Sequence, residues 1–285
     1  MQWGDVRIDI VEDGILMMDG GAMFGVVPKA LWNRTNPADE KNRIQLRTCG
    51  LLIRTGRQNI LVDTGTGELS EKAAEIYGFT GPHLLESLAE YGLSAGDIDT
   101  VVCTHLHFDH CGGGTHPDGS GRSVPVFENA RYLIQKKEIE EANTGNERTR
   151  RSYLDENIAP LVDSGQAVFV DGTEEICSGI YTQLTGAHTG GHQTVYIEGP
   201  NSKAVFLGDF IPTASHLRIP YIAAYDMYPA DMIEKKKVFL RQAFEQQWLL
   251  IFQHDPYTHM GYLEHDEKGN AVLSEGLNAD RGTQV

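Results

Sequence analysis

The apolar positions of the chain fall into short runs that are interrupted by Gly, Asp and Pro. Such runs cover residues 6–12, 49–55, 59–65 and 99–105 in the first half, and 167–170, 180–186, 192–199, 203–209 and 248–253 in the second. The runs are short, rich in β-branched residues and bounded by turn residues, which favours strands over helices. The pattern therefore predicts a strand-rich block in each half of the chain.

Two longer segments show the periodicity of helices. Residues 82–92 space their leucines on one helix face, with Pro82 suited to the first turn and Gly92 to the end. Residues 231–247 predict a second amphipathic helix, in which the basic run 235–237 is expected on a solvated face.

Strands interleaved with helices in this way predict the fold class. The expected architecture is α/β (α+β), a four-layer αββα sandwich of two sheets packed face to face with helices outside, in one domain over residues 1–285. The Gly- and Ser-rich segment 112–124 is expected to be a surface loop rather than a linker. The polar tail after residue 275 is expected to be loose.

The charge of the chain limits its partners. Its 40 acidic and 24 basic residues give a net charge of −16. An acidic surface repels phosphate backbones and anionic lipid headgroups, so we expect a small-molecule substrate and neither nucleic acid nor a membrane as partner. No apolar run approaches the roughly 18 residues of a membrane span, and the first residues carry charges where a signal peptide is apolar. We therefore expect a cytoplasmic protein, and leave a homodimer open.

The four cysteines are not arranged as a metal-binding or redox motif. None of them forms a CxxC pair, and a chain of 285 residues needs no disulfides for stability, so reduced thiols are expected. Cys111 directly follows the segment with the most histidines, and we interpret it as a small buried hydrophobic residue.

One segment gathers metal-binding side chains. Residues 104–113 read THLHFDHCGG and contain His105, His107, Asp109 and His110. They follow a predicted buried strand, where ligands are rigid on one side and open to solvent on the other. The first two lie two positions apart and the last two are adjacent, so the pairs are expected to face two directions and to serve two metal ions. The glycines that follow allow tight backbone paths.

Further donors are required, because a divalent ion takes about four protein ligands, or three and a solvent molecule. Candidates at the ends of later predicted strands are His188, Asp209 and His254. A carboxylate has two oxygens, so Asp209 can bridge two cations. Imidazoles mixed with carboxylates suit Zn²⁺, the metal we expect, and also Mn²⁺, Fe²⁺ or Co²⁺. A donor set without cysteine favours open catalytic coordination over a structural zinc site.

The sequence resembles the metallo-β-lactamase superfamily in four motifs that occur in the same order. They are LVDTG (61–65), THLHFDH (104–110), GAHTGGH (186–192) and LGD (207–209). The family has the αββα sandwich. The resemblance implies two ligand sets, the first with His105, His107 and His188, the second with Asp109, His110 and His254, and both with the bridging Asp209. It also implies that Asp63 and His192 support these ligands without binding metal.

Within this family the sequence is similar to the N-acyl-homoserine lactone lactonases, which act in quorum quenching. Asp209 argues against the antibiotic-hydrolysing β-lactamases, which carry a cysteine there, and segments 18–32 and 253–257 resemble the YtnP-type branch of the lactonases. The resemblance implies a dinuclear metal-dependent hydrolase that opens the lactone ring with a metal-bridging hydroxide. Asp109 and Asp209 then have the catalytic roles.

One position departs from the lactonase pattern. Pro212 stands where better-known lactonases carry a tyrosine, and Tyr225 and Tyr257 are candidates to replace it. Met23 and Phe24 are candidates to contact the acyl chain, with packing of this N-terminal segment as the alternative. The departure keeps a second function open, a broader hydrolase of esters, thioesters or organophosphates at the same two metals.

Overall fold

The computed structural model describes residues 1–267 and 269–274, so the tail predicted to be loose after residue 275 lies outside the described residues. The described chain forms two compact units. Unit 1 comprises residues 1–15 and 48–174, and unit 2 comprises residues 16–47 together with those from 175 on. The single domain expected for residues 1–285 stays a prediction.

Unit 1 is built on a seven-stranded sheet with the strand order β1-β2-β3-β4-β5-β8-β9 among the described residues. The strands are β1 (Gln2–Trp3), β2 (Val6–Asp19), β3 (Arg43–Arg54), β4 (Asn59–Val62), β5 (Thr100–Val102), β8 (Arg131–Gln135) and β9 (Ala167–Val170), of which β2 and β3 continue into unit 2. Strands β4, β5, β8 and β9 are parallel. The segments that follow them therefore begin at the same edge of the sheet.

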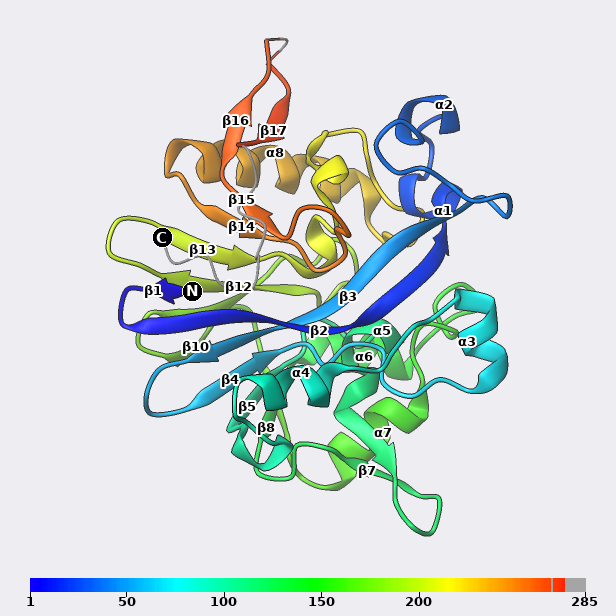
Figure 1. Cartoon of the computed structure of the whole chain (residues 1–285), viewed down its shortest axis with the longest axis vertical. Helices are drawn as coiled ribbons and strands as arrows, with labels where there is room; N and C mark the ends of the chain where they lie inside the picture. Colours follow the sequence, from blue (N-terminus) through cyan, green and yellow to red (C-terminus); the bar gives the residue numbers. More distant parts are fainter. Residues whose placement is uncertain (268, 275–285) are drawn as a thin grey trace. The chain divides into compact units, whose positions relative to one another are not determined.

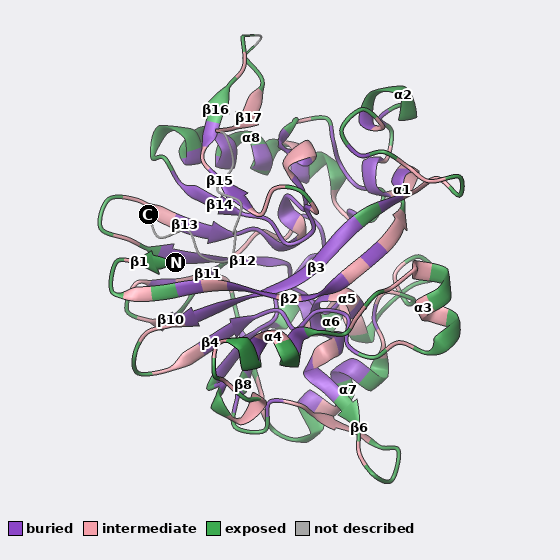
Figure 2. Ribbon diagram, viewed as in Figure 1, coloured by how far each residue is buried: buried purple, intermediate pink, exposed green. Residues whose placement is uncertain are grey.

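The helices of unit 1 share an apolar core with this sheet. Unit 1 contains α3 (Glu71–Tyr77), α4 (Leu84–Glu90), η1 (Ala95–Asp97), α5 (Phe108–Cys111), η2 (Gly112–Gly114), β6 (Thr115–Pro117), β7 (Ser123–Pro125), α6 (Lys136–Asn143) and α7 (Asp155–Asp163). Leu88 of α4 and Leu161 of α7 belong to one buried cluster with Val101 of β5. By contrast, α3 has no buried residue, and Figure 2 shows it in the colours of exposed and intermediate positions.

Unit 2 is built on a second sheet, with the order β10-β11-β12-β13-β14-β15 in the described chain. Its elements are α1 (Gly20–Phe24), α2 (Lys29–Trp32), β10 (Glu174–Cys177), β11 (Ile180–Leu184), β12 (Gln193–Glu198), β13 (Lys203–Phe206), η3 (Gly208–Phe210), η4 (Ala214–Leu217), α8 (Pro229–Glu245), β14 (Leu249–Ile251), β15 (Met260–Gly261), β16 (Leu263–His265) and β17 (Ala271–Leu273). Strands β13 and β14 are parallel neighbours. The residues after both strands therefore lie at one edge of this sheet.

The long helix α8 covers part of this second sheet. Met232 and Phe239 of α8 pack in one buried cluster with Val205 of β13 and Leu250 of β14. Figure 1 shows α8 along these strands, with the β16–β17 hairpin projecting beyond it. Burial of aromatic and aliphatic side chains between helix and sheet is the main source of stability of such a layer.

The predicted strands and helices are found, with shifted ends. The predicted strand 6–12 continues through Asp13 to Asp19, because the Asp13 carboxylate is buried and hydrogen-bonded instead of ending the strand. It accepts hydrogen bonds from the Thr48 hydroxyl (3.0 Å) and the Thr66 backbone N–H (2.7 Å). Burial raises the pKa of Asp13 to about 6. Partners distant in sequence thus decide the length of this strand.

Two sequence expectations are correct only in part, since residues 119–122 and the side chains of Lys235 and Lys237 are exposed as expected. The segment expected as a surface loop at 112–124 begins with Gly112 and Gly114, which are buried, and continues as the β6–β7 hairpin. The basic run on α8 does not lie wholly on a solvated face, because Lys236 is 1% exposed. Its Nζ donates to the backbone carbonyls of His216 (2.7 Å) and Tyr221 (2.8 Å), which satisfies a buried amine that periodicity alone cannot place.

Gly67, Gly112 and Gly113 bring two backbone segments of unit 1 together. A Cβ built at Gly113 would overlap the carbonyl oxygen of Thr64, and one at Gly112 would overlap that of Thr66. Gly67 has a φ of +66°, and a Cβ there would lie 2.6 Å from the Gly112 carbonyl carbon. The turn after β4 therefore packs directly on the turn that follows His110.

We expect Gly113→Ala to lower the free energy of unfolding by about 1–3 kcal/mol, because the added methyl group forces the two backbones apart. Gly119→Ala in the β6–β7 hairpin is the matched control, since a Cβ there meets nothing within 4 Å. Urea unfolding of both variants without metal measures the difference. Equal stabilities for the two variants would show that the close approach is unimportant.

Candidate metal centre

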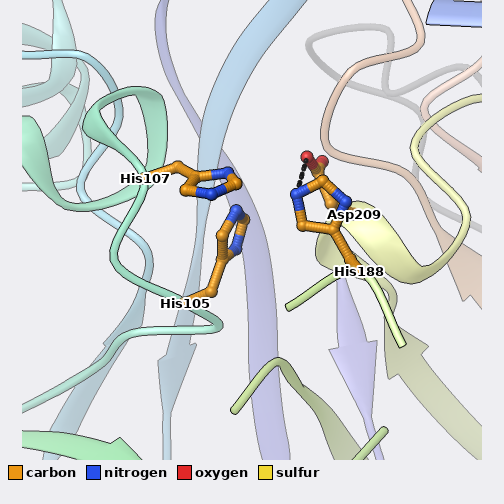
Figure 3. A group of neighbouring side chains, drawn as sticks. All are labelled: His105, His107, His188 and Asp209. Carbon is orange, nitrogen blue, oxygen red and sulfur yellow. Dashed lines mark ion pairs between the residues drawn. The ribbon is translucent and has the colours of Figure 1, made fainter. Parts of the chain in front are cut away.

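The first group of metal-binding side chains lies in unit 1, directly after β5. His105, His107 and His110 are buried, and Asp109 is partly exposed. The rings of His105 and His107 are 4.4 Å apart between centroids, and those of His105 and His110 are 3.9 Å apart. Figure 3 shows the first pair of rings side by side. We call His105, His107, Asp109 and His110 the unit 1 cluster.

Asp63 and Thr104 hold this cluster in place. The Asp63 carboxylate accepts a hydrogen bond from His110 Nδ1 (3.0 Å), from the Thr104 N–H (2.7 Å) and from the Thr104 hydroxyl (2.7 Å). Asp63 has a φ of +56°, an unfavourable conformation for an aspartate that the surrounding contacts must maintain. With its proton on Nδ1, His110 presents the lone pair of Nε2, as a metal ligand requires.

The second group lies in unit 2, at the edge where β13 and β14 end. The two oxygens of Asp209 face different imidazoles: Oδ2 lies 3.2 Å from His188 Nε2, and Oδ1 lies 3.0 Å from His254 Nε2. Figure 3 marks the first of these contacts with a dashed line. We call His188, Asp209 and His254 the unit 2 cluster. One carboxylate addressing two rings through separate oxygens is the geometry that a bridging ligand needs.

Each ring of the unit 2 cluster is held at its other nitrogen. His188 Nδ1 donates to Asp226 Oδ1 (2.7 Å), and His254 Nδ1 donates to the backbone carbonyl of Arg47 (2.7 Å). Both bonds fix the proton on Nδ1 and leave Nε2 directed at Asp209. The sequence did not point to Asp226 or Arg47, because neither lies in a motif and a backbone carbonyl carries no sequence signal.

Among the described residues, the donor set of the two clusters is five imidazoles and two carboxylates, with no thiolate. Imidazole nitrogens and carboxylate oxygens fit a divalent transition metal such as Zn²⁺. Histidine ligands in metalloproteins are usually held by a hydrogen bond from the ring nitrogen that does not bind metal. Nδ1 of His110, of His188 and of His254 makes such a bond. Each cluster is thus chemically suited to hold a metal ion.

Known proteins agree with these observations. A model of the metallo-beta-lactamase superfamily matches residues 48–254, which contain both clusters. The chain belongs to the metallo-beta-lactamase superfamily. The enzyme class predicted from the sequence, a metal-dependent hydrolase, is thereby confirmed at the level of this family.

Several relatives in the metallo-beta-lactamase superfamily are lactonases. An N-acyl homoserine lactonase of Bacillus cereus is 29% identical over 178 residues, which are 58% of this chain and 64% of that protein. N-acyl homoserine lactonase AttM of Rhizobium radiobacter is 24% identical over 179 residues, or 60% of this chain and 64% of that protein. The matched part thus spans slightly less than two thirds of these curated relatives.

Solved structures confirm the fold class. The structure of a probable metal-dependent hydrolase from Staphylococcus aureus is 36% identical, with a TM-score of 0.88 over 98% of this chain and 100% of that one. AidC, a dizinc quorum-quenching lactonase, is 22% identical, with a TM-score of 0.80 over 98% of this chain and 97% of its own. The predicted metallo-β-lactamase fold is therefore correct. AidC, at its low identity, supports the fold alone.

Two other histidines of this superfamily member are engaged at both ring nitrogens. His192 Nδ1 contacts the Thr185 hydroxyl (2.7 Å), and its Nε2 accepts the backbone N–H of Asp209 (3.0 Å). It therefore holds the Asp209 backbone, and the supporting role that the resemblance implied for it stays a prediction. His216 contacts the Thr213 hydroxyl through Nδ1 (2.8 Å) and the Met23 carbonyl through Nε2 (2.8 Å).

The predicted substrate residues differ in their surroundings. Phe24 is fully buried, and its ring stacks on Trp32 at 5.3 Å and on His216 at 4.7 Å between centroids. Met23 is 5% exposed and belongs to the same cluster. These contacts agree with the packing alternative for this segment. Tyr225 is 36% exposed, and its contact with substrate stays a prediction.

No helix in the described part of the chain is both long and apolar enough for a membrane span.

Asp226→Asn should weaken the binding of Zn²⁺ to the protein by about 10- to 100-fold, because the amide is a poorer acceptor for His188 Nδ1. Competition with a chromophoric chelator measures this affinity. Asp231→Asn, an exposed aspartate at the start of α8, is the matched control. Equal affinities in both variants would show that Asp226 does not support His188.

Acid should destabilise the protein through His216. Burial lowers the pKa of His216 from 6.5 to about 4, so between these values the unfolded chain binds a proton that the folded chain does not. The stabilising contribution is complete above pH 6.5 and is lost as the pH falls through about 4. Between pH 6.5 and about 4, the unfolding free energy of the metal-free protein decreases as the pH falls, partly because of His216. His216→Gln should reduce this pH dependence by up to about 1.4 kcal/mol per pH unit. His116→Gln, at an exposed histidine, should leave the slope unchanged.

Proposed function

We propose that the unit 1 and unit 2 clusters are the ligands of one dinuclear metal centre that opens the lactone ring of N-acyl-homoserine lactones. The observation that carries the proposal is the Asp209 carboxylate, with one oxygen 3.2 Å from His188 Nε2 and the other 3.0 Å from His254 Nε2. Two rings that share one carboxylate in this way are suited to hold two neighbouring cations. The order of the sequence motifs supports the same arrangement.

The proposed ligands are those predicted from the sequence, with Zn²⁺ as the expected metal. His105, His107 and His188 form one set, Asp109, His110 and His254 form the other, and Asp209 belongs to both. When bound, two divalent ions would supply Lewis acidity and would lower the pKa of a bound water to about 7. The role of the protein is to hold the seven donor side chains in place and to leave the metal centre accessible to the substrate.

The two carboxylates are the cluster members best placed to act on substrate. The side chain of Asp109 is 14% exposed and that of Asp209 is 13% exposed, whereas the His110 side chain is 0% and the His254 side chain 2% exposed. In ring opening, water adds to the carbonyl carbon, the ring C–O bond breaks and the ring oxygen takes a proton. We assign to Asp109 the delivery of that proton and to Asp209 the positioning of the attacking water.

The charge of the chain suits this reaction. An N-acyl-homoserine lactone is neutral, and its hydrolysis product carries a carboxylate. A net charge of −16 does not hinder the approach of a neutral substrate and favours the departure of an anionic product. Relatives named N-acyl homoserine lactonases support the choice of substrate.

The proline at position 212 favours a second candidate function, a broader hydrolase of esters, thioesters or organophosphates. Pro212 has no hydroxyl to polarise a lactone, and its carbonyl accepts the His254 N–H at 3.1 Å. The same two metals and carboxylates could also hydrolyse these other substrates, so the shape of the substrate-binding surface decides which class of substrate is accepted.

The metal-loaded protein should acidify a weakly buffered solution of N-acyl-homoserine lactones, because each ring opened yields a carboxylic acid that releases a proton. The rate is measured by pH indicator for lactones of graded chain length, beside p-nitrophenyl esters and paraoxon. Asp209→Ala, which removes the bridging carboxylate, should lower the rate by at least about 10³-fold.

Simple esters hydrolysed much faster than every lactone would replace the first function with the second. If the wild-type protein with two bound zinc ions hydrolyses none of these substrates, both candidates are rejected.

A further inference from the structure

The peptide between two predicted metal ligands of unit 1 is held from both sides. Leu106 lies between His105 and His107, and its side chain is fully buried. Its backbone N–H donates to Glu138 Oε1 at 2.9 Å, and its carbonyl accepts the Cys111 thiol at 3.4 Å. The orientation of this peptide sets the direction in which the two neighbouring imidazoles leave the backbone.

Glu138 reaches this peptide from helix α6. It is 1% exposed, and the same Oε1 atom also accepts the hydroxyl of Tyr153 at 3.0 Å. The ring of Tyr153 in turn lies against that of His107, with centroids 5.0 Å apart and planes at 63°. A single carboxylate oxygen therefore links the backbone on one side of His107 to the ring that packs on His107.

A second backbone contact extends this arrangement. The N–H of Phe108, the residue after His107, donates to the carbonyl of Ser152 at 2.9 Å. Ser152 directly precedes Tyr153, so the backbone on both sides of His107 and its ring are all contacted from residues 138, 152 and 153. We call Glu138, Ser152 and Tyr153 the histidine clamp.

A buried carboxylate is costly, and a residue that only filled space in this core would be apolar. Glu138 lies beside an apolar cluster that includes Leu106, Cys111 and Tyr153. Its negative charge contributes to raising the pKa of the Cys111 thiol, after the larger effect of burial. Hydrogen bonds to a charged acceptor are stronger and more directional than those to a neutral one, which suits a group that fixes geometry.

We propose that Glu138 and Tyr153 are positioning residues for the metal centre: they hold the Leu106 peptide and the His107 ring so that His105 and His107 bind metal. This inference rests on the proposed metal centre, and it adds residues from α6 and from the segment before α7 that no metal-binding motif contains.

Zn²⁺ affinity of the full-length protein tests the clamp. Glu138→Ala should weaken Zn²⁺ binding by about tenfold or more, measured by chelator competition well below the unfolding temperature. Glu138→Gln keeps an oxygen at the position of Oε1 and should restore the affinity to within about threefold of wild type. Tyr153→Phe keeps the ring on His107 but loses the hydroxyl, and should weaken binding about two- to fivefold. The absorption bands of bound Co²⁺ should shift in Glu138→Ala.

Gln135→Ala is the matched control in the same part of unit 1. Gln135 is 2% exposed and makes two hydrogen bonds to the Gly172 backbone, so its removal also breaks buried hydrogen bonds, to a residue outside the histidine clamp. It should lower the unfolding temperature but leave Zn²⁺ affinity and the Co²⁺ spectrum unchanged. A Glu138→Ala protein that behaves like Gln135→Ala would overturn the proposal. If Glu138→Ala does not fold, unchanged affinity and spectrum in Tyr153→Phe overturn it.

The outcome for the clamp is separate from that for the substrate. A wild-type protein that binds zinc but opens no lactone rejects the proposed activity, while the zinc affinities of the variants still decide the role of Glu138 and Tyr153.

Discussion

The candidate metal centre depends on hydrogen bonds that hold imidazole rings at Nδ1, so that Nε2 is available to a metal ion. His110 is held by Asp63, His188 by Asp226, and His254 by the carbonyl of Arg47. These rings are buried, so water cannot substitute for a missing partner, and an unheld ring could turn its Nδ1 toward the site. The acceptors thus decide which nitrogen carries the proton, and with it whether the ring can be a ligand.

The partner of the second ring nitrogen separates the proposed ligands from two other buried histidines. His192 and His216 lie close in sequence to residues of the unit 2 cluster, but Nε2 of each contacts a backbone group. By contrast, Nε2 of His188 and of His254 faces the Asp209 carboxylate. A carboxylate can bind a metal ion together with an imidazole, whereas the backbone N–H at His192 and the backbone carbonyl at His216 occupy the ring nitrogen itself. Their contacts have other uses: His192 holds the backbone of Asp209, and His216 joins the segment around Met23 to the turn after Pro212. Burial and histidine content alone would not have distinguished the two kinds of ring.

Sheet topology explains why proposed ligands and their partners, distant in sequence, become neighbours within each unit. In unit 1, Asp63 follows β4 and Thr104 follows the parallel strand β5, so the acceptor and the ligand segment leave the same edge. In unit 2, Asp209 follows β13 and His254 follows the parallel strand β14. When several apolar strands, each followed by a polar residue, lie parallel in one sheet, those polar residues therefore cluster at one edge. The strands supply rigidity, and the turns after them supply the functional groups.

The sequence by itself determined the ligand candidates, because His105, His107, Asp109 and His110 are concentrated within six positions and the other donors end apolar runs. It also determined most strands and helices, since their periodicity is local. Only the tertiary structure decided the groups that orient these ligands. Asp226 lies 38 residues from His188, the Arg47 carbonyl lies 207 residues from His254, and Glu138 lies 32 residues from Leu106. Such partners are chosen by proximity in the fold, and a hydrogen bond to a backbone carbonyl or a buried carboxylate leaves no periodic trace in the chain.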